Sequence, residues 1–475
     1  MWKSKQIAEI LKAELRGDPE ISVFGCVIDS RQARGGEAFF ALAGEKVDGH
    51  DYIEAAWRNG ASAAIAEKAK LKGRPDISVP EGKALILVES GLAAMQDLAR
   101  VWRLELGAKV VGITGSNGKT TTKDMAAAVL AQKYQVYRNK ENQNNELGVP
   151  MTLLNAPEGT EILVVEMGMR GLGQIKALCK FVQPDTGVIT NIGTTHMELL
   201  GSQENIAKAK WELIDALPKD GTAILNSEDF WSVKKAEKDS HQQFFFGIEG
   251  KYHPANLQGK NLIQTGTLGT QFECGDLSEE ALVQLPLPGE HNVLDALAAL
   301  AVGRLYGVSI SQGCQGLKEL ELSKMRLELH KGIYKSTILS DVYNANPTSM
   351  KASLEVLSQR ADQRTLAILG EMYELGDASA SGHYEVGQAA AQLGITELIT
   401  VGKLADAIAQ GALEAGMLPE KVHICPDRAS AIDQAKNILS TFGGETWVLI
   451  KASRGMKMEK ITEALEIDHN NLSDS

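Results

Sequence analysis

Cysteine, positive charge and long apolar runs are all scarce in this 475-residue sequence. Its five cysteines are scattered, odd in number and never spaced as C-x-x-C, which argues against a disulfide framework and a zinc site. No apolar stretch approaches the about 20 residues that cross a bilayer, so no membrane span is predicted. The net charge of −12 disfavours nucleic acid as a partner, because a phosphate backbone attracts a basic surface.

The N-terminal segment also lacks the unbroken apolar core of a signal peptide. Residues 1–17 carry Ile7, Ile10, Leu11 and Leu15 at helical spacing, with charges between them. This pattern predicts an amphipathic surface helix. We therefore expect a cytoplasmic protein.

Strands and helices alternate along most of the chain. Continuous apolar runs, typical of parallel strands buried on both faces, occur at 109–114 and 162–166 and again near 187–190 and 223–225. Such alternation predicts parallel sheets with helical crossovers. The predicted class is α/β with three domains: 1–90, a small α/β unit; 91–322, a central unit; and 323–475, a second doubly wound sheet with strands near 365–369, 397–401 and 447–450.

A glycine-rich turn lies between the apolar run at 109–114 and a helix-forming segment, and it reads G-x-x-G-S-N-G-K-T-T-T. Gly115 and Gly118 allow the main chain to approach phosphate oxygens, Lys119 neutralises their charge, and Thr120 is suited to ligate Mg²⁺. The first glycine is Gly112, one position earlier than in the general G-x-x-x-x-G-K-[ST] pattern. The turn therefore predicts ATP binding in a family apart from motors and kinases.

Polar residues follow several other predicted strands. Glu166 ends one strand and is either a Mg²⁺ ligand or a solvated carboxylate, and His196 follows the next strand as a second candidate ligand. Lys208 and Lys210 share a helical stretch, and composition gives no reason to separate them. Asn292 is suited to cap a helix or to read an adenine edge. The segment 341–350, D-V-Y-N-A-N-P-T-S-M, is rich in hydrogen-bonding groups at a strand end, which favours a ligand site over a plain loop.

The order of these motifs resembles the Mur ligases of peptidoglycan synthesis over nearly the whole chain. The resemblance includes E-M-G-M-R at 166–170, N-I-G-T-T-H at 191–196, A-K-A-K-W-E at 207–212 and H-N-V-L-D-A at 291–296. D-x-Y-N-A-N-P-x-S-M at 341–350, followed by G-E-M-Y-E-L-G at 370–376, is similar to the members that add D-alanyl-D-alanine. The resemblance implies a UDP-substrate domain, a P-loop ATPase domain and a C-terminal Rossmann-like domain for D-alanyl-D-alanine.

The resemblance also implies roles for individual residues. It selects Lys210 as the lysine that CO₂ converts to a carbamate, and this requires a neutral amine. The implied Mg²⁺ ligands are Thr120, Glu166, His196 and carbamylated Lys210. The implied ATP-binding residues are Gly115, Asn117, Gly118, Lys119, Thr120, Thr121, Asn292 at the adenine, Asp341 at the ribose and Arg326 at the phosphates. The implied UDP-substrate residues are Ser30, Arg31, Asp48, Asn144 and Asn145. The implied catalytic residues are Lys119, His196, Lys210 and Arg326.

The sequence departs from the family pattern at two positions. Asp295 replaces a more frequent Asn, and Ala452 replaces a common Gly. Neither change affects the metal or phosphate groups. The implied reaction is ATP- and Mg²⁺-dependent ligation of D-alanyl-D-alanine to UDP-N-acetylmuramoyl-tripeptide through an acyl phosphate, by a monomer. The alternatives are an earlier-step Mur ligase that adds a diamino acid, a P-loop kinase or motor, and a nucleotide-sensing module without catalysis.

Overall fold

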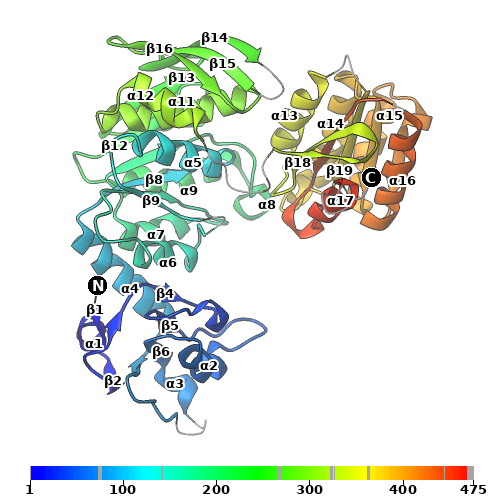
Figure 1. Ribbon diagram of the computed structural model, residues 1–475. Coiled ribbons are helices and arrows are strands. Elements are labelled where there is room, and N and C mark those ends of the chain that lie inside the picture. The colour runs from blue at the N-terminus through cyan, green and yellow to red at the C-terminus, as the bar shows by residue number, and fades with distance from the viewer. Residues whose placement is uncertain are drawn as a thin grey trace, which may run out of the picture.

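The chain forms three α/β units, which Figure 1 colours from blue through green to red. The computed structural model describes residues 2–72, 77–140, 143–265, 269–320, 325, 327–360, 364–442 and 444–467. None of the helices in these ranges combines the length and apolarity needed to cross a bilayer. All five cysteines are free thiols, and four of them are buried. The domain boundaries at 90 and 322 stay predictions.

The N-terminal unit is built on a five-stranded sheet of order β2-β7-β6-β5-β4. Helix α1 ends at Leu11, where Lys12 adopts a left-handed conformation with φ 51°. The predicted helix over 1–17 is therefore wrong in its second half: Leu15 lies in β2 and pairs with Ile86. The elements are β1 (Trp2–Lys3), α1 (Ser4–Leu11), β2 (Glu14–Gly17), β3 (Ser22–Val23), β4 (Cys26–Val27), β5 (Ala38–Phe40), α2 (Ile53–Arg58), β6 (Ala63–Glu67), α3 (Lys68–Leu71) and β7 (Ala84–Val88).

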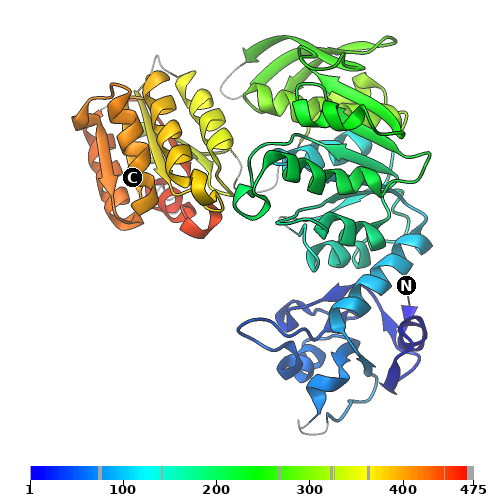
Figure 2. The same cartoon turned by 180° about the vertical axis from the view of Figure 1, so that it is seen from behind.

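Helix α4 (Gly91–Leu106) connects the N-terminal unit to the central one, as Figure 2 shows from behind. Ser90 caps its first turn and Gly107 ends it with φ 63°. Its last turns are fixed to the central unit, because Trp102 Nε1 donates to the Ala156 carbonyl at 3.0 Å and Arg103 Nη2 donates to the Gln183 carbonyl at 2.8 Å. One helix thus belongs to two cores.

The central unit contains a nine-stranded sheet of order β16-β15-β14-β13-β12-β11-β8-β10-β9. Helices α5, α11 and α12 pack on one face, and α6, α7, α9 and α10 pack on the other. The strands are β8 (Lys109–Thr114), β9 (Val136–Arg138), β10 (Ile162–Glu166), β11 (Thr186–Ile189), β12 (Thr222–Asn226), β13 (Gln242–Gly247), β14 (Leu257–Thr265), β15 (Gly269–Gly275) and β16 (Glu280–Leu285). The helices are α5 (Lys119–Leu130), α6 (Gly148–Leu154), α7 (Gln174–Val182), α8 (Met197–Leu200), α9 (Gln203–Asp215), α10 (Phe230–Ala236), α11 (Glu290–Leu305) and α12 (Ile310–Lys318).

The predicted strands β8, β10, β11 and β12 are parallel, as expected, and so are β9 and β13, which the sequence analysis missed. Strand β14 pairs parallel with β13, and β14, β15 and β16 form an antiparallel extension that the sequence analysis also missed. Its residues alternate between buried and partly exposed, so the extension lacks the continuous apolar runs that identify the parallel strands.

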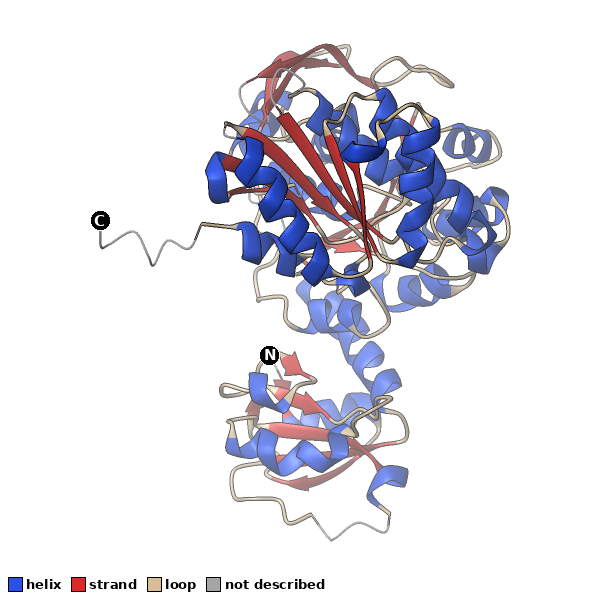
Figure 3. Cartoon of the chain, turned by 90° about the vertical axis from the view of Figure 1, so that its right-hand side faces the viewer, coloured by secondary structure: helices blue, strands red, loops and turns tan. Residues whose placement is uncertain are grey.

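The C-terminal unit is a six-stranded sheet of order β17-β18-β22-β19-β20-β21, with only its β17–β18 pair antiparallel among the described strands. Helices cover both sides of it (Figure 3), with α13, α14 and α15 on one face and α16 and α17 on the other. The elements are β17 (Glu328–Lys331), β18 (Ser336–Asp341), α13 (Pro347–Ser358), β19 (Arg364–Gly370), α14 (Ser379–Gln392), β20 (Glu397–Val401), α15 (Asp406–Glu414), β21 (Val422–Cys425), α16 (Arg428–Phe442), β22 (Thr446–Lys451) and α17 (Glu459–Leu465).

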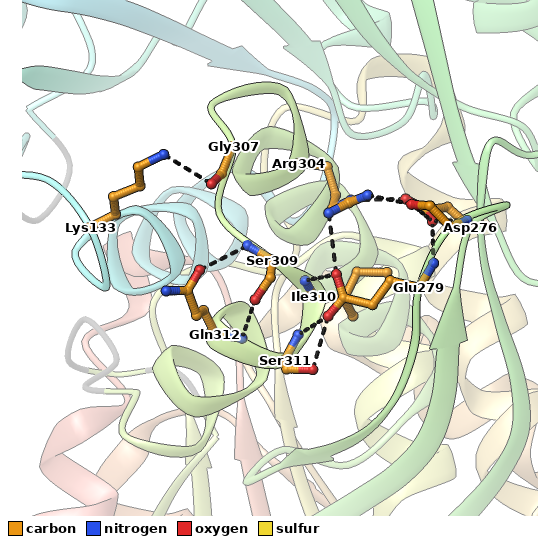
Figure 4. Close-up of polar contacts among 10 residues, drawn as sticks. Lys133, Asp276, Glu279, Arg304, Gly307, Ser309, Ile310, Ser311 and Gln312 are labelled. Atoms are coloured by element: carbon orange, nitrogen blue, oxygen red, sulfur yellow. Dashed lines mark hydrogen bonds and ion pairs between the residues drawn. The ribbon is translucent and has the colours of Figure 1, made fainter.

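The turn between β15 and β16 fixes the antiparallel extension to the helices beneath it (Figure 4). Glu279 accepts hydrogen bonds from the Ile310 and Ser311 backbone amides at 2.9 and 2.8 Å, and so satisfies two free N–H groups at the start of α12. Arg304 of α11 contacts Glu279 at 3.2 Å and Asp276 at 2.8 Å. Glu279 therefore acts as a helix cap that is distant in sequence.

We expect Glu279→Gln to lower the free energy of unfolding by about 1–2 kcal/mol at pH 7, because it removes a charged helix cap. Burial alone would raise the pKa of Glu279, but hydrogen bonds from Ser311 and Ile310 outweigh it and lower the pKa. The stabilisation is therefore complete above the unfolded-state pKa of about 4.3 and is lost as the pH falls through the folded-state value. Thermal unfolding of the wild type and of Glu279→Gln at pH 7 and at about pH 3.5 checks this prediction. The control is Glu280→Gln, which changes the exposed glutamate next in the sequence. An equal loss of stability in the two variants contradicts the cap.

Candidate nucleotide and ligation site

A cleft of about 910 Å³ lies between the central and C-terminal units. The carboxyl ends of parallel strands β8 and β10 open into it from one side, and those of β18 and β22 from the other. This is the edge at which open α/β sheets bind ligands. The cleft is lined by the predicted residues Gly115, Asn117, Gly118, Lys119, Thr120, Thr121, Asn144, Asn145, Glu166, His196, Lys210, Asn292 and Asp341.

The glycine-rich turn forms the floor of the cleft between β8 and α5. Gly118 has φ 78°, and a Cβ there would lie 2.2 Å from Asp295 Oδ1. A Cβ at Gly115 would lie 1.8 Å from Thr190 Oγ1. Both positions therefore require glycine, and the turn presents the N-terminal amides of α5 to the cleft, as phosphate binding needs.

Two lysines donate to the same backbone carbonyl in this floor. Lys119 Nζ lies 2.9 Å from the Gly115 carbonyl oxygen, and Lys210 Nζ, which reaches it from α9, lies 2.7 Å away. Lys210 is 2% exposed, and this burial, together with the charge of Lys119, holds its pKa well below the ordinary lysine value. Lys208 is exposed. The structure thus separates two lysines that composition could not, and Lys210, which the resemblance selects, is the buried one.

Thr120 and Glu166 form an oxygen pair beside the turn. Thr120 Oγ1 donates to Glu166 Oε2 at 2.8 Å, and Asn144 Nδ2 donates to Glu166 Oε1 at 2.7 Å. Two oxygens bound at right angles to one Mg²⁺ lie about 2.9 Å apart, so the Thr120–Glu166 pair fits adjacent positions of an octahedral site. Among the described residues, no group of three or more acidic, histidine or cysteine side chains is arranged so that it could hold a metal ion. A pair of protein oxygens is nonetheless typical of Mg²⁺ bound with substrate phosphates.

His196 does not join that pair in the structure. It adopts a left-handed conformation with φ 66°, and its Nδ1 lies 3.0 Å from Glu374 Oε2 of the C-terminal unit. A second contact joins the same two units, because Asn346 Nδ2 donates to Asn117 Oδ1 at 2.6 Å. Asn346 also caps α13 through the Ser349 amide. The segment 341–350 therefore faces the glycine-rich turn.

The predicted adenine and ribose residues are engaged within the protein. Asn292 lies in the first turn of α11, whose cap position is Gly289, so the capping interpretation of Asn292 is wrong. Its Nδ2 donates instead to the Pro288 carbonyl at 2.6 Å. Asp341 accepts hydrogen bonds from Lys451 and, at 2.8 Å, from Ser353 Oγ.

The structure does not bring all predicted residues into the cleft. Ser30, Arg31 and Asp48 belong to the N-terminal unit and do not line it. Arg31 pairs with Asp29, and Asp48 Oδ1 lies 2.6 Å from His50 Nδ1. Asn144 and Asn145 are the predicted UDP-substrate residues at the cleft wall. Arg326 lies outside the described residues.

Sequence reasoning missed several residues that the structure places around the site. Lys123 and Asn139 are buried beside Glu166, and Tyr373 and Glu374 reach the cleft from the C-terminal unit. Lys123 carried a signal that was not used, since a lysine in the middle of a buried helix needs a partner. Asn139 carried none.

Three family models match successive parts of the chain: the Mur ligase family catalytic domain at residues 22–103, the Mur ligase middle domain at 113–303, and the Mur ligase glutamate ligase domain at 325–454. The chain is 37% identical over 469 residues to UDP-N-acetylmuramoyl-tripeptide–D-alanyl-D-alanine ligase of Bacillus subtilis strain 168, covering 97% of each protein.

Two solved structures share the architecture. A crystal structure of MurF from Acinetobacter baumannii is 30% identical with a TM-score of 0.85, over 97% of this chain and 98% of that one. The MurF ligase of Thermotoga maritima in complex with ADP is 29% identical with a TM-score of 0.77, over 93% of this chain and 97% of that one.

Proposed function

Since the chain belongs to the Mur ligase family, we propose that it joins D-alanyl-D-alanine to UDP-N-acetylmuramoyl-tripeptide at the expense of ATP. The name of the Bacillus relative states these two substrates. One observation carries the proposal: the glycine-rich turn, the Thr120–Glu166 pair, buried Lys210 and the 341–350 segment all line one cleft. A kinase or motor has no need of such a lysine or of the N-terminal unit.

The reaction is activation of a carboxylate followed by amide formation. The terminal carboxylate of the tripeptide attacks the γ-phosphate of ATP in line and displaces ADP, which gives an acyl phosphate. The amine of D-alanyl-D-alanine then attacks the acyl carbon, loses a proton and releases inorganic phosphate. Such phosphoryl transfer depends mostly on positioning and charge neutralisation.

We assign the binding of the ATP phosphates to the glycine-rich turn that forms the floor of the cleft. The amides of residues 115–121 hold the β- and γ-phosphates, and Lys119 turns from the Gly115 carbonyl toward the γ-phosphate. Thr120 and Glu166 would hold Mg²⁺, with His196 a further proposed ligand. When bound, this ion neutralises charge on the phosphates.

We further propose that Lys210 is carbamylated by CO₂. Its amine is buried and its pKa is lowered, which favours the neutral form that CO₂ requires. A protonated Lys210 would place a second cation beside Lys119 on one carbonyl oxygen, and an anionic carbamate removes this repulsion. The resulting carboxylate-like oxygens suit Mg²⁺.

The remaining assignments rest on the family resemblance. Asn292 would meet the adenine, Asp341 the ribose and Arg326 the phosphates. Ser30, Arg31 and Asp48 would hold the uridine diphosphate in the N-terminal unit, with Asn144 and Asn145 nearer the sugar. Closure of the units around the substrates would exclude water, which would otherwise hydrolyse the acyl phosphate.

We also propose that the protein acts as a monomer in the cytoplasm. All residues assigned to the reaction come from one chain, and the reaction draws on ATP.

Phosphate release against a panel of substrates tests the function. We expect phosphate from ATP only when UDP-N-acetylmuramoyl-tripeptide and D-alanyl-D-alanine are both present, because the acyl phosphate needs one to form and the other to react. Equal release with a UDP-muramoyl-dipeptide and a free diamino acid would indicate an earlier-step ligase. Release without any UDP-sugar would indicate a kinase or motor.

A further inference from the structure

Lys123 is a buried cation that the proposed reaction does not use. It lies on α5 one turn after Lys119, and its side chain is fully buried. Burial of a lysine is costly unless its ammonium group is well partnered. Its Nζ donates to the Asn139 carbonyl at 3.0 Å and lies 3.2 Å from Asp124 Oδ1. Asp124 in turn pairs with Arg138.

Asn139, whose carbonyl accepts the hydrogen bond from Lys123, binds the backbone of Glu166 through both polar atoms of its side chain. Asn139 Oδ1 accepts from the Glu166 amide at 2.7 Å, and Asn139 Nδ2 donates to the Glu166 carbonyl at 3.0 Å. The same Nδ2 also donates to the Gln143 carbonyl at 2.7 Å. Asn139 is 1% exposed, so water does not compete for these bonds.

The far end of this network reaches the Glu166 carboxylate itself. Asn144 follows Gln143 and donates to Glu166 Oε1, while Gly168 donates to the Asn144 carbonyl at 2.8 Å. The backbone of Glu166 is thus held by Asn139, which Lys123 fixes to α5, and its side chain by Asn144, which follows the Gln143 that Asn139 also binds. Thr120, the partner of Glu166 Oε2, lies on the same helix as Lys123.

We propose that Lys123 is a positioning residue that holds Glu166 at the correct distance from Thr120 for a divalent cation to bind between them. The inference rests on the proposed function, because it concerns the cation that accompanies ATP. Lys123 links α5, which carries Thr120, to Asn139, which hydrogen-bonds to the backbone of Glu166. Without it, the Asn139 carbonyl loses a buried donor, and the direct Thr120–Glu166 hydrogen bond loses the support that fixes Asn139 to α5.

Charge and positioning predict opposite effects for the removal of Lys123. A positive charge near Glu166 repels a cation, so Lys123→Met would tighten cation binding if the charge alone mattered. Loss of positioning weakens it, typically by tenfold or more.

Mn²⁺ binding in the presence of ADP, measured by the electron paramagnetic resonance of free Mn²⁺, distinguishes the two. We expect Lys123→Met to weaken Mn²⁺ binding about tenfold, and Lys123→Gln, which keeps a donor, to weaken it less. The control is Lys133→Met, which removes a lysine that also donates to one carbonyl, that of Gly307, at 3.0 Å (Figure 4).

Unchanged or tighter binding in folded Lys123→Met would overturn the proposal. If that variant does not fold, Lys123→Gln decides in the same way: weaker binding than wild type supports positioning, and equal or tighter binding rejects it. The measurement needs neither peptide substrate. Failure of the wild-type protein to ligate D-alanyl-D-alanine would therefore reject the proposed function and leave the Mn²⁺ comparison readable.

Discussion

Lys210→Ala is expected to reduce ligation by at least about 10³-fold, because it removes the proposed carbamate and with it a group that steadies the charged phosphates. Small carboxylates such as formate or acetate are expected to restore part of the activity, since they can occupy the space left by the side chain. Phosphate release with and without these anions measures both effects. The fold should persist, because the Lys210 amine donates to the Gly115 carbonyl, which keeps Lys119 Nζ as a second donor.

The chain offers a matched control for this experiment. Lys208 lies on the same helix two residues earlier, but its side chain is exposed. Lys208→Ala is therefore expected to keep wild-type activity. Near-wild-type activity of Lys210→Ala, or full inactivity of both variants, contradicts the assignment. A carbamate carbon signal from ¹³C-labelled bicarbonate that is present in the wild type and absent in Lys210→Ala would identify the modification directly.

Lys119→Ala is expected to lower kcat by about 10²–10³-fold, because its ammonium group neutralises charge that develops during phosphoryl transfer. The Michaelis constant for the UDP-substrate should change little, since that substrate is proposed to bind mainly to the N-terminal unit. Steady-state kinetics with each substrate varied in turn separate the two parameters.

Thermal unfolding controls for damage to the fold in this variant. Lys119 Nζ contacts the Gly115 and Ser116 carbonyls, both within its own loop. We therefore expect an unfolding midpoint close to that of the wild type. A decrease in kcat of less than threefold would argue against the role of Lys119 in phosphoryl transfer. An equal decrease caused by Lys109→Ala, at the opposite end of β8, would also argue against it.

The sequence predicted those parallel strands whose burial is uniform, and it missed β9 and β13, which are partly exposed. Strands β8, β10 and β20 are buried along nearly their whole length, so an apolar run marks each of them from end to end. The antiparallel strands β14 to β16 escaped because one face of each is partly exposed. The helix predicted to include Leu15 ended early at Lys12, where the left-handed backbone reverses the chain.

The site was predictable where a motif is local, and not where it depends on contacts distant in sequence. Gly115, Gly118 and Lys119 lie within one turn, so spacing alone identified them. The choice of Lys210 over Lys208 depends on which face of α9 meets the sheet, and composition does not encode this. The approach of Glu374 to His196 joins residues on two separate units and has no local signal.

The polar contacts between the central and C-terminal units bear on inhibitor design. The Asn117–Asn346 hydrogen bond and the His196–Glu374 pair join side chains that line the cleft, where water can replace them. Each such bond contributes only about 1 kcal/mol net, so thermal motion readily exchanges it for hydration. If a compound binds only one shape of the cleft, its apparent affinity falls in proportion to the fraction of the protein that has this shape. A compound that binds Asn117 and Asn346 together stabilises the arrangement of the two units in which both side chains contact it. Its dissociation rate then depends on its contacts with both units.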